Sequence, residues 1–382
     1  MPLHRRRNAA VPRDHAWQPE SAVAPYRAPR WLAGGHAQTI WPYRLRRPDV
    51  PLRRERVDAP DGDFWDFDWL DAPATPAAPC VVLFHGLEGG SASLYARALL
   101  DALSRRGWQG VVPHFRGCGG EPNRLPRAYH SGDHAEIAAM LAAIRARIPA
   151  ASRLHAVGVS LGGSALLNWL GRAGSDAARM VTAAAAVSAP LDLTVAGVAL
   201  GKGVNRVYAR HFLSTLKPKS LAIAKRFPGL LDAAKIRRVR TMRDFDNVVT
   251  APLHGFAGSD DYWKRASSKP WLRAIRVPTL VLNARNDPLI PARSLPTKDE
   301  VSACVTLEQP RHGGHAGFAR GPFPGTIDWL PARLLHYFAT IDAGPRHASS
   351  GAPLLTPDGK RATPNAQPLP ALNAQRPTPD PK

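Results

Sequence analysis

Apolar runs of strand length alternate with longer amphipathic segments along most of the chain. The runs lie at residues 80–84, 110–113, 154–157, 183–187 and 279–282. Helix-length segments rich in Ala, Leu and Arg separate several of them, as at residues 92–105 and 133–147. Because such an alternation is typical of a parallel sheet covered by helices, we predict an α/β fold with a mostly parallel central sheet and helices on both faces.

The alternation is interrupted at two places. Residues 53–59 and 64–70 flank the turn Asp61-Gly62-Asp63, which predicts a hairpin and an antiparallel start to the sheet. Residues 191–271 form a long insertion between the run at 183–187 and the next strand. We expect this insertion to be a helical cap that covers a site, excludes water and shapes a pocket.

The segment Gly158-Val159-Ser160-Leu161-Gly162 carries the strongest chemical signal. It lies between the apolar run at 154–157 and a small-residue segment at 163–170. A Gly-x-Ser-x-Gly turn between a strand and a helix is typical of a nucleophile elbow, which lifts a serine hydroxyl toward a base. The glycines carry no Cβ to obstruct the crossing of strand and helix, and Ser160 is expected in a strained conformation.

The partners of such a serine are expected downstream, in the order acid and then histidine. Asp287 follows the run at 279–282, near the strand end where catalytic groups of parallel sheets collect, so it is the candidate acid. A solvated turn aspartate before proline is the alternative. His312 and His315 compete as the base, and the two glycines between them favour His315, because they make its loop compact and bendable.

Two backbone amides are candidates for an oxyanion hole. One is the N–H of Leu161, directly after the serine, and the other is that of Leu87, in the loop after the strand at 80–84. His85 lies in the same loop and could be considered as the base. It precedes the serine in the chain, however, so we expect it to support the oxyanion loop from below.

Several further blocks of sequence occur in a fixed order. They are residues 31–42 (WLAGGHAQTIWP), 84–89 (FHGLEG), 114–123 (HFRGCGGEPN), 129–132 (YHSG), 250–256 (TAPLHGF) and 267–271 (SSKPW). From about Tyr26 to about Ala339 the chain resembles the YheT-like branch of the α/β-hydrolases, bacterial relatives of eukaryotic membrane-anchored α/β-hydrolase-domain proteins. The resemblance implies an α/β-hydrolase fold with a triad at Ser160, Asp287 and His315. The implied activity is hydrolysis of carboxylic esters with short- to medium-chain acyl groups.

The chain has 382 residues, 44% of them hydrophobic, which suffices for one large core. We therefore expect a single α/β-hydrolase domain at residues 25–342 that includes the cap. Residues 1–24 are basic, lack the apolar region of a secretory signal peptide, and are expected to be disordered. The tail at 343–382 is rich in Pro and Ala and is likewise expected to be disordered.

The cellular compartment is inferred from cysteines and hydropathy. No run approaches the roughly 18 apolar residues of a membrane span, and the three cysteines are an odd set far apart in sequence. We expect a reducing, cytoplasmic environment. Cys118 lies in an Arg-Gly-Cys-Gly-Gly loop without a placed base, so we expect a structural or incidental role rather than a nucleophilic one.

The formal net charge of +21 raises the question of whether the protein binds nucleic acid or an anionic membrane. Residues 201–243 contain twelve Lys or Arg and one acid, Asp232, and so carry about half of that charge. The basic residues are not interleaved with stacking aromatics, which argues against nucleic acid. A solvated basic face is the simplest interpretation, and transient contact with an anionic membrane at its inner surface is the alternative.

Other chemistries were weighed against the serine hydrolase. His36, His130, Asp133 and His134 match no zinc spacing, so loop packing is the preferred interpretation. The predicted acyl transfer acts on a small-molecule ester or acylglycerol-like substrate and needs neither a metal nor an organic cofactor. A lipase, thioesterase, amidase or acyltransferase with the same triad is the nearest alternative, and a non-catalytic lipid-binding protein on this scaffold is a more distant one.

Overall fold

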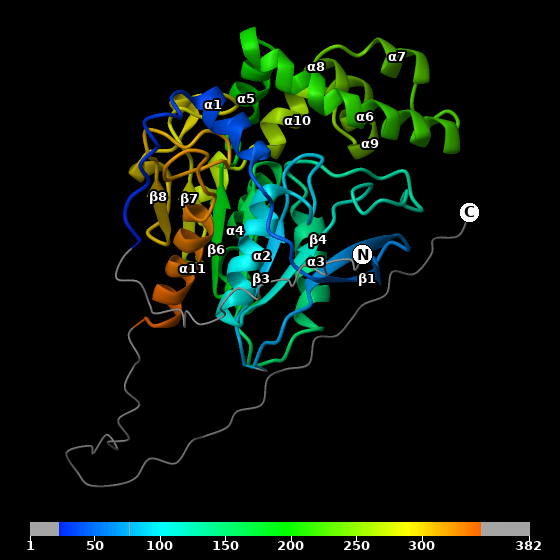
Figure 1. The fold of residues 1–382 in the computed structure, drawn as a ribbon. Helices are drawn as coiled ribbons and strands as arrows, with labels where there is room; N and C mark the ends of the chain where they lie inside the picture. The colour runs from blue at the N-terminus through cyan, green and yellow to red at the C-terminus, as the bar shows by residue number, and fades with distance from the viewer. Residues whose placement is uncertain (1–22, 76, 345–382) are drawn as a thin grey trace, which may run out of the picture. The chain divides into compact units, whose positions relative to one another are not determined.

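The computed structural model describes residues 23–75 and 77–344, and an eight-stranded sheet lies at its centre (Figure 1). The strand order is β1-β2-β4-β3-β5-β6-β7-β8. The strands are β1 Leu52–Asp58, β2 Phe64–Leu70, β3 Cys80–Phe84, β4 Gln109–Pro113, β5 Leu154–Val159, β6 Ala183–Val187, β7 Thr279–Leu282 and β8 Val305–Glu308. Strands β3 to β8 pair in parallel, so the prediction of a mostly parallel α/β sheet is confirmed.

The first two strands form the predicted hairpin. β1 and β2 pair antiparallel from Leu52 opposite Leu70 to Asp58 opposite Phe64. Gly62 occupies the turn with φ 86°, a left-handed conformation that glycine adopts without strain. β2 also pairs antiparallel with β4, so the hairpin is the antiparallel edge of an otherwise parallel sheet.

Helices cover both faces of the sheet. Their bounds are α2 Leu94–Arg106, α3 His134–Arg145, α4 Leu161–Ala173 and α11 Trp329–Asp342. Buried apolar side chains of α2 and α11 pack on one face with Val81 and Leu83 of β3. Those of α3 and α4 pack on the other face with Val82 and Phe84. Neighbouring residues of β3 thus point to opposite faces, as the twofold period of a strand requires, and both faces belong to the core.

The segment between β6 and β7, predicted as the cap at residues 191–271, contains six α-helices among its described residues. They are α5 Leu193–Leu200, α6 Arg206–Arg226, α7 Ala233–Arg238, α8 Met242–Phe245, α9 Ala251–His254 and α10 Ser259–Ala266. Figure 1 shows these helices gathered over the carboxyl ends of the parallel strands. Within the described residues, no helix is long and apolar enough to cross a membrane.

The chain near the amino end contacts the last helix and the loop before it. The indole N–H of Trp329 donates to the carbonyl of Ala24 over 3.0 Å, and the Tyr26 hydroxyl donates to the carbonyl of Ala319 over 2.7 Å. The predictions of disorder for residues 1–24 and 343–382 concern segments that lie almost entirely outside the described residues. Ala24 itself is described, so the contacts of the domain begin upstream of residue 25.

Candidate active site

Ser160 occupies the turn between β5 and α4. Its φ of 53° and ψ of −120° lie outside the regions that side chains favour, which is the strain expected at an elbow. Its N–H donates to the carbonyl of Val187, at the end of β6, over 2.8 Å. The turn therefore fixes the serine at the carboxyl edge of the sheet.

The glycines on either side of Ser160 lie where backbones approach closely. A Cβ on Gly158 would stand 2.5 Å from the carbonyl oxygen of Gly162, and one on Gly162 would stand 2.5 Å from that of His85. Backbone atoms of this kind cannot yield as a flexible side chain can. Both positions thus require glycine for the crossing of strand and helix.

We expect Gly158→Ala to lower the free energy of unfolding by about 3 kcal/mol or more, because the added methyl overlaps backbone atoms of α4. Urea unfolding followed by circular dichroism measures the change. Gly201→Ala is the matched control, since a Cβ there has its nearest contact at 3.5 Å and φ is −79°. Equal stability of the two variants would contradict the close crossing.

The structure brings the three predicted side chains together. His315 Nε2 lies 2.9 Å from Ser160 Oγ, and His315 Nδ1 lies 2.8 Å from Asp287 Oδ2. A carboxylate only accepts hydrogen bonds, so Nδ1–H donates to it and Nε2 is left to accept from the serine hydroxyl. Asp287 is buried, and its Oδ1 accepts the N–H of Leu289 over 2.8 Å, which fixes the carboxylate in the loop after β7.

The loop that carries His315 is held by side chains to which the sequence analysis gave no role. Gln38 Oε1 accepts the N–H of Gly313 over 2.8 Å, and Thr39 Oγ1 accepts that of His315 over 2.9 Å. Both come from α1 Gly35–Ile40. Ser188 Oγ accepts the next amide, that of Ala316, over 2.9 Å. The block at residues 31–42 was the available signal for α1, since it is far from the triad in sequence yet shared with the family.

The two other candidate histidines take no part in the hydrogen-bonded relay that Asp287, His315 and Ser160 form. His312 is exposed, and its Nδ1 lies 3.5 Å from the side-chain amide of Asn286. His85 is fully buried, with Nδ1 2.8 Å from the carbonyl of Gly86 and Nε2 accepting the N–H of Phe115 over 3.1 Å. Burial lowers the pKa of His85 to about 3, so it stays neutral as a structural group beneath the loop after β3.

Leu87 and Leu161, whose backbone amides are predicted for an oxyanion hole, line the same cavity as Ser160 and His315. Leu161 is the first residue of α4, where backbone N–H groups have no partner within the helix. Leu87 follows β3 by three residues. Among the described residues, neither amide has an acceptor within hydrogen-bonding distance. Both N–H groups are thus available to an oxygen bound beside the serine.

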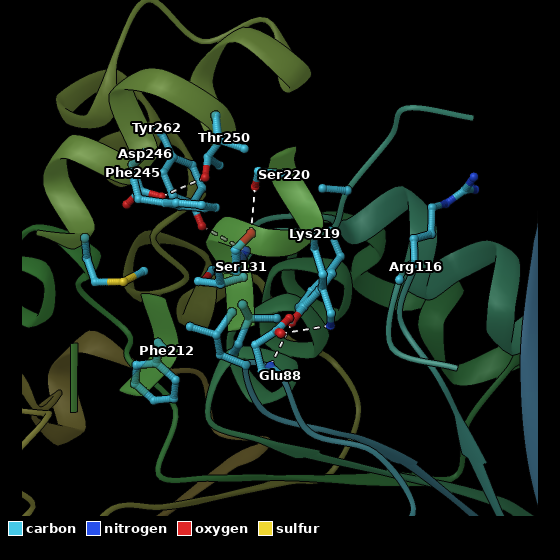
Figure 2. A pocket seen from close by; sticks show the side chains of 18 of the residues that line it. Glu88, Arg116, Ser131, Phe212, Lys219, Ser220, Phe245, Asp246, Thr250 and Tyr262 are labelled. Atoms are coloured by element: carbon cyan, nitrogen blue, oxygen red, sulfur yellow. Dashed lines mark hydrogen bonds and ion pairs between the residues drawn. The ribbon is translucent and has the colours of Figure 1, made fainter. Parts of the chain in front are cut away.

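The serine opens into a cavity of about 460 Å³ between the sheet and the cap. Its volume falls within the range of roughly 300–1,000 Å³ that is usual for small-molecule sites. The walls are mainly apolar and come from the loops after β3 and β4, from α5 and α6, and from the segment around α8 and α10. Figure 2 shows the polar side chains that interrupt them, Glu88 and Lys219 in one region and Asp246 with Thr250 in another.

Asp246 is a buried acid in the cavity wall. It begins the π-helical turn Asp246–Thr250 and accepts hydrogen bonds from the Thr250 hydroxyl over 2.7 Å and the Trp263 indole over 2.8 Å. Both donors are neutral. Burial raises the pKa of Asp246 from 3.8 to about 6. Single π-turns are frequent at functional sites, and this one places a buried carboxyl in the wall of the cavity.

This raised pKa predicts a pH-dependent contribution to stability. Between about pH 4 and pH 6 the folded protein keeps a proton that the unfolded chain has lost, so the stability falls as the pH rises through that window. Relative to Asp246→Asn, the free energy of unfolding of the wild type should fall by roughly 2 kcal/mol from pH 4 to pH 7. Urea unfolding of both proteins across this range is the measurement. If the free energies of unfolding of the two proteins changed with pH in the same way, the burial of this carboxyl would be contradicted.

Other titratable side chains were considered as ligands or nucleophiles. His36 Nδ1 lies 3.0 Å from the Tyr208 hydroxyl, whereas the ring of His130 packs 4.6 Å from that of His254. In the described part of the chain, no three His, Cys, Asp or Glu side chains converge as metal ligands would. Burial raises the pKa of the Cys118 thiol to about 11, so it is protonated near neutral pH and a weak nucleophile.

Known proteins have this fold and are similar to this chain in sequence. The alpha/beta hydrolase fold family matches residues 79–322. YheT of Escherichia coli strain K12, named as a candidate esterase, is 38% identical over 84% of this chain and 94% of its own length. Human phospholipase ABHD3 is 29% identical over 77% of this chain and 73% of its own length. A monoacylglycerol lipase of Saccharomyces cerevisiae is 30% identical over 63% of this chain and 55% of its own length.

A mostly parallel sheet with a serine elbow at its carboxyl edge is the architecture of the α/β-hydrolases. Within that class, the chain belongs to the YheT-like family, since it is 38% identical to YheT over 84% of this chain and 94% of YheT. The family and the fold predicted from the sequence blocks are thereby confirmed, and the chain is a hydrolase of the esterase and lipase type.

Proposed function

We propose that this protein cleaves carboxylic esters through an acyl-enzyme on Ser160. His315 takes the serine proton as Oγ attacks the ester carbonyl, and Asp287 holds the imidazole and stabilises its charged form. His315 then gives the proton to the leaving alcohol, and water repeats the attack on the acyl-enzyme. The observation that carries the proposal is the hydrogen-bonded relay from Asp287 through His315 to Ser160, which ends in the cavity.

The oxyanion of each tetrahedral intermediate is assigned to the N–H groups of Leu87 and Leu161. Preorganised amides stabilise developing negative charge without reorganising, and such donors commonly supply several kcal/mol of the rate enhancement. Both residues line the same cavity as Ser160, and neither amide has an acceptor within the described residues, which supports the assignment. Every group in this mechanism belongs to the protein, to the ester or to the attacking water.

The acyl group is assigned to the apolar part of the cavity. A short- to medium-chain acyl group fits an enclosed volume of about 460 Å³ lined by side chains such as Leu193, Phe212 and Val249. The relatives are named as an esterase, a phospholipase and a monoacylglycerol lipase, so acylglycerol-like esters belong among the substrates to be tried.

Hydrolysis of p-nitrophenyl esters from acetyl to palmitoyl, together with labelling by a fluorophosphonate, tests the proposal. We expect turnover with an optimum at short to medium chains and a label on Ser160. Thioesters and monoacylglycerols in the same series separate an esterase from a thioesterase or a lipase. A monoacylglycerol in anionic and in neutral vesicles tests the basic cap, which should raise the rate on the anionic ones. A wild type that neither hydrolyses any ester nor takes the label would refute the proposed function.

A further inference from the structure

An ion pair in the cavity wall joins the cap to the loop that follows β3. Lys219 of α6 places its Nζ 2.8 Å from Oε2 of Glu88 (Figure 2). Glu88 directly follows Leu87, whose amide is assigned to the oxyanion hole. The pair thus links a cap helix to the residue next to an oxyanion donor.

Glu88 is held in one conformation at both its backbone and its side chain. Its φ is 57°, in the left-handed region that residues other than glycine rarely adopt. Its N–H donates to the Tyr129 hydroxyl over 2.8 Å, and the same hydroxyl donates to Glu88 Oε1 over 3.0 Å. The peptide that joins Leu87 to Glu88 is thereby fixed, and the orientation of the loop depends on the carboxylate keeping its partners.

Lys219 is the charged partner of this carboxylate, and it comes from the cap. The Glu88 side chain is only 8% exposed, so its charge depends on partners within the protein. Among the described residues, its other side-chain hydrogen-bonding contacts, the Tyr129 hydroxyl and the Cys118 thiol at 3.9 Å, are neutral groups. Without Lys219 a buried carboxylate would lack a counter-charge, and the strained loop would relax toward solvent.

The position of Lys219 on α6 explains how the cap reaches the loop. Phe212, Leu216, Lys219 and Ile223 recur at intervals of three and four residues and all line the cavity, which identifies this face of the helix as the one over the site. Lys225, in contrast, is exposed and does not line the cavity. A shift of α6 would therefore move the Lys219 ammonium relative to the loop.

We propose that Glu88 and Lys219 are positioning residues, and that through their ion pair the cap fixes the orientation of the Leu87 amide. With α6 closed over the site, the ion pair holds Glu88 and aims the Leu87 N–H at the developing oxyanion. With the pair broken, the loop relaxes and the donor is misaligned. The inference rests on the proposed ester hydrolysis, because the Leu87 amide acts as an oxyanion donor only if Ser160 carries out that acyl transfer.

A double-mutant cycle tests the coupling. Glu88→Gln and Lys219→Met should each lower kcat for a p-nitrophenyl ester by roughly 10- to 100-fold, with KM changed by less than about twofold, since the donor acts mainly in the transition state. The double variant should be no slower than the worse single variant. Lys225→Met, the matched control on the same helix, should retain wild-type kcat. Additive losses in the double variant would overturn the proposal.

Hydrogen exchange gives a second measurement that does not need turnover. Amides of residues 86–89 should exchange faster in Lys219→Met than in the wild type, while the thermal unfolding midpoint stays within a few degrees. Unchanged exchange would overturn the positioning role even if kcat fell. An inactive, unlabelled wild type whose loop still responds to Lys219→Met would refute ester hydrolysis alone and leave the cap-to-loop contact established.

Discussion

Ser160→Ala will lower kcat for ester hydrolysis by about 10⁶-fold, the loss typical of removing a triad nucleophile. The variant keeps the cavity and both oxyanion amides but has no oxygen that can attack the carbonyl. Residual turnover then requires direct attack by water, with help from the remaining donors alone. Turnover of the best p-nitrophenyl ester measures the effect, and the fluorophosphonate label should disappear with it.

The result is specific only if the fold survives. Circular dichroism should give the same unfolding curve for Ser160→Ala as for the wild type, or a more stable one, because the strained residue loses no hydrogen bond needed by the core. Ser214→Ala, in an exposed part of α6, is the control and should match wild-type turnover. If Ser160→Ala retained more than about a hundredth of the wild-type rate, a different nucleophile would be at work.

Asp287→Asn should lower kcat by about 10⁴-fold while the structure stays intact. The Asp287 Oδ1 accepts the N–H of Leu289, so an asparagine oxygen remains there and its amide group faces His315. That amide donates, which forces Nδ1 of His315 to accept and moves the proton to Nε2. Nε2 then meets the Ser160 hydroxyl as a donor and cannot remove its proton.

Single-turnover kinetics with the same ester distinguish this effect from lost binding. Acylation should be slow while KM changes little, and the fluorophosphonate should still label Ser160, though slowly. Asp260→Asn, at a carboxylate whose side chain is 77% exposed, is the matched control and should behave as wild type. An Asp287→Asn enzyme with normal kcat would mean that another group orients His315.

The triad candidates were predictable because each signal is local. The elbow needs two glycines around a serine, and the acid and the histidine follow successive strands in a known order. The structure places Ser160, Asp287 and His315 within one hydrogen-bonded relay, as that order predicts. The sheet was predictable for a similar reason, since strands buried on both faces show as short apolar runs.

The contacts that support the site were beyond sequence reasoning, because they join residues far apart in the chain. Gln38 lies in a block shared with the family, but nothing in that block indicates that its side chain accepts the amide of Gly313. Lys219 was one of twelve basic residues assigned to a charged face. Its position on α6 turns it instead toward Glu88, and only the packing of the cap on the sheet decides that direction.

Two hydrogen bonds from α1 hold the loop at residues 313–315, and this affects when the site can form during biosynthesis. The two hydrogen bonds join residues 275 and 276 positions apart. At the usual rate of translation, α1 emerges roughly 15–55 s before the loop that it holds. In the later part of that interval, once Ser160 has been made, the nascent chain contains the elbow serine but not His315, the proposed base. Under the proposed mechanism, reactivity toward esters is acquired late, when the loop at residues 313–315 has been made and α1 binds it, and an interrupted translation product that ends before residue 313 would be inert.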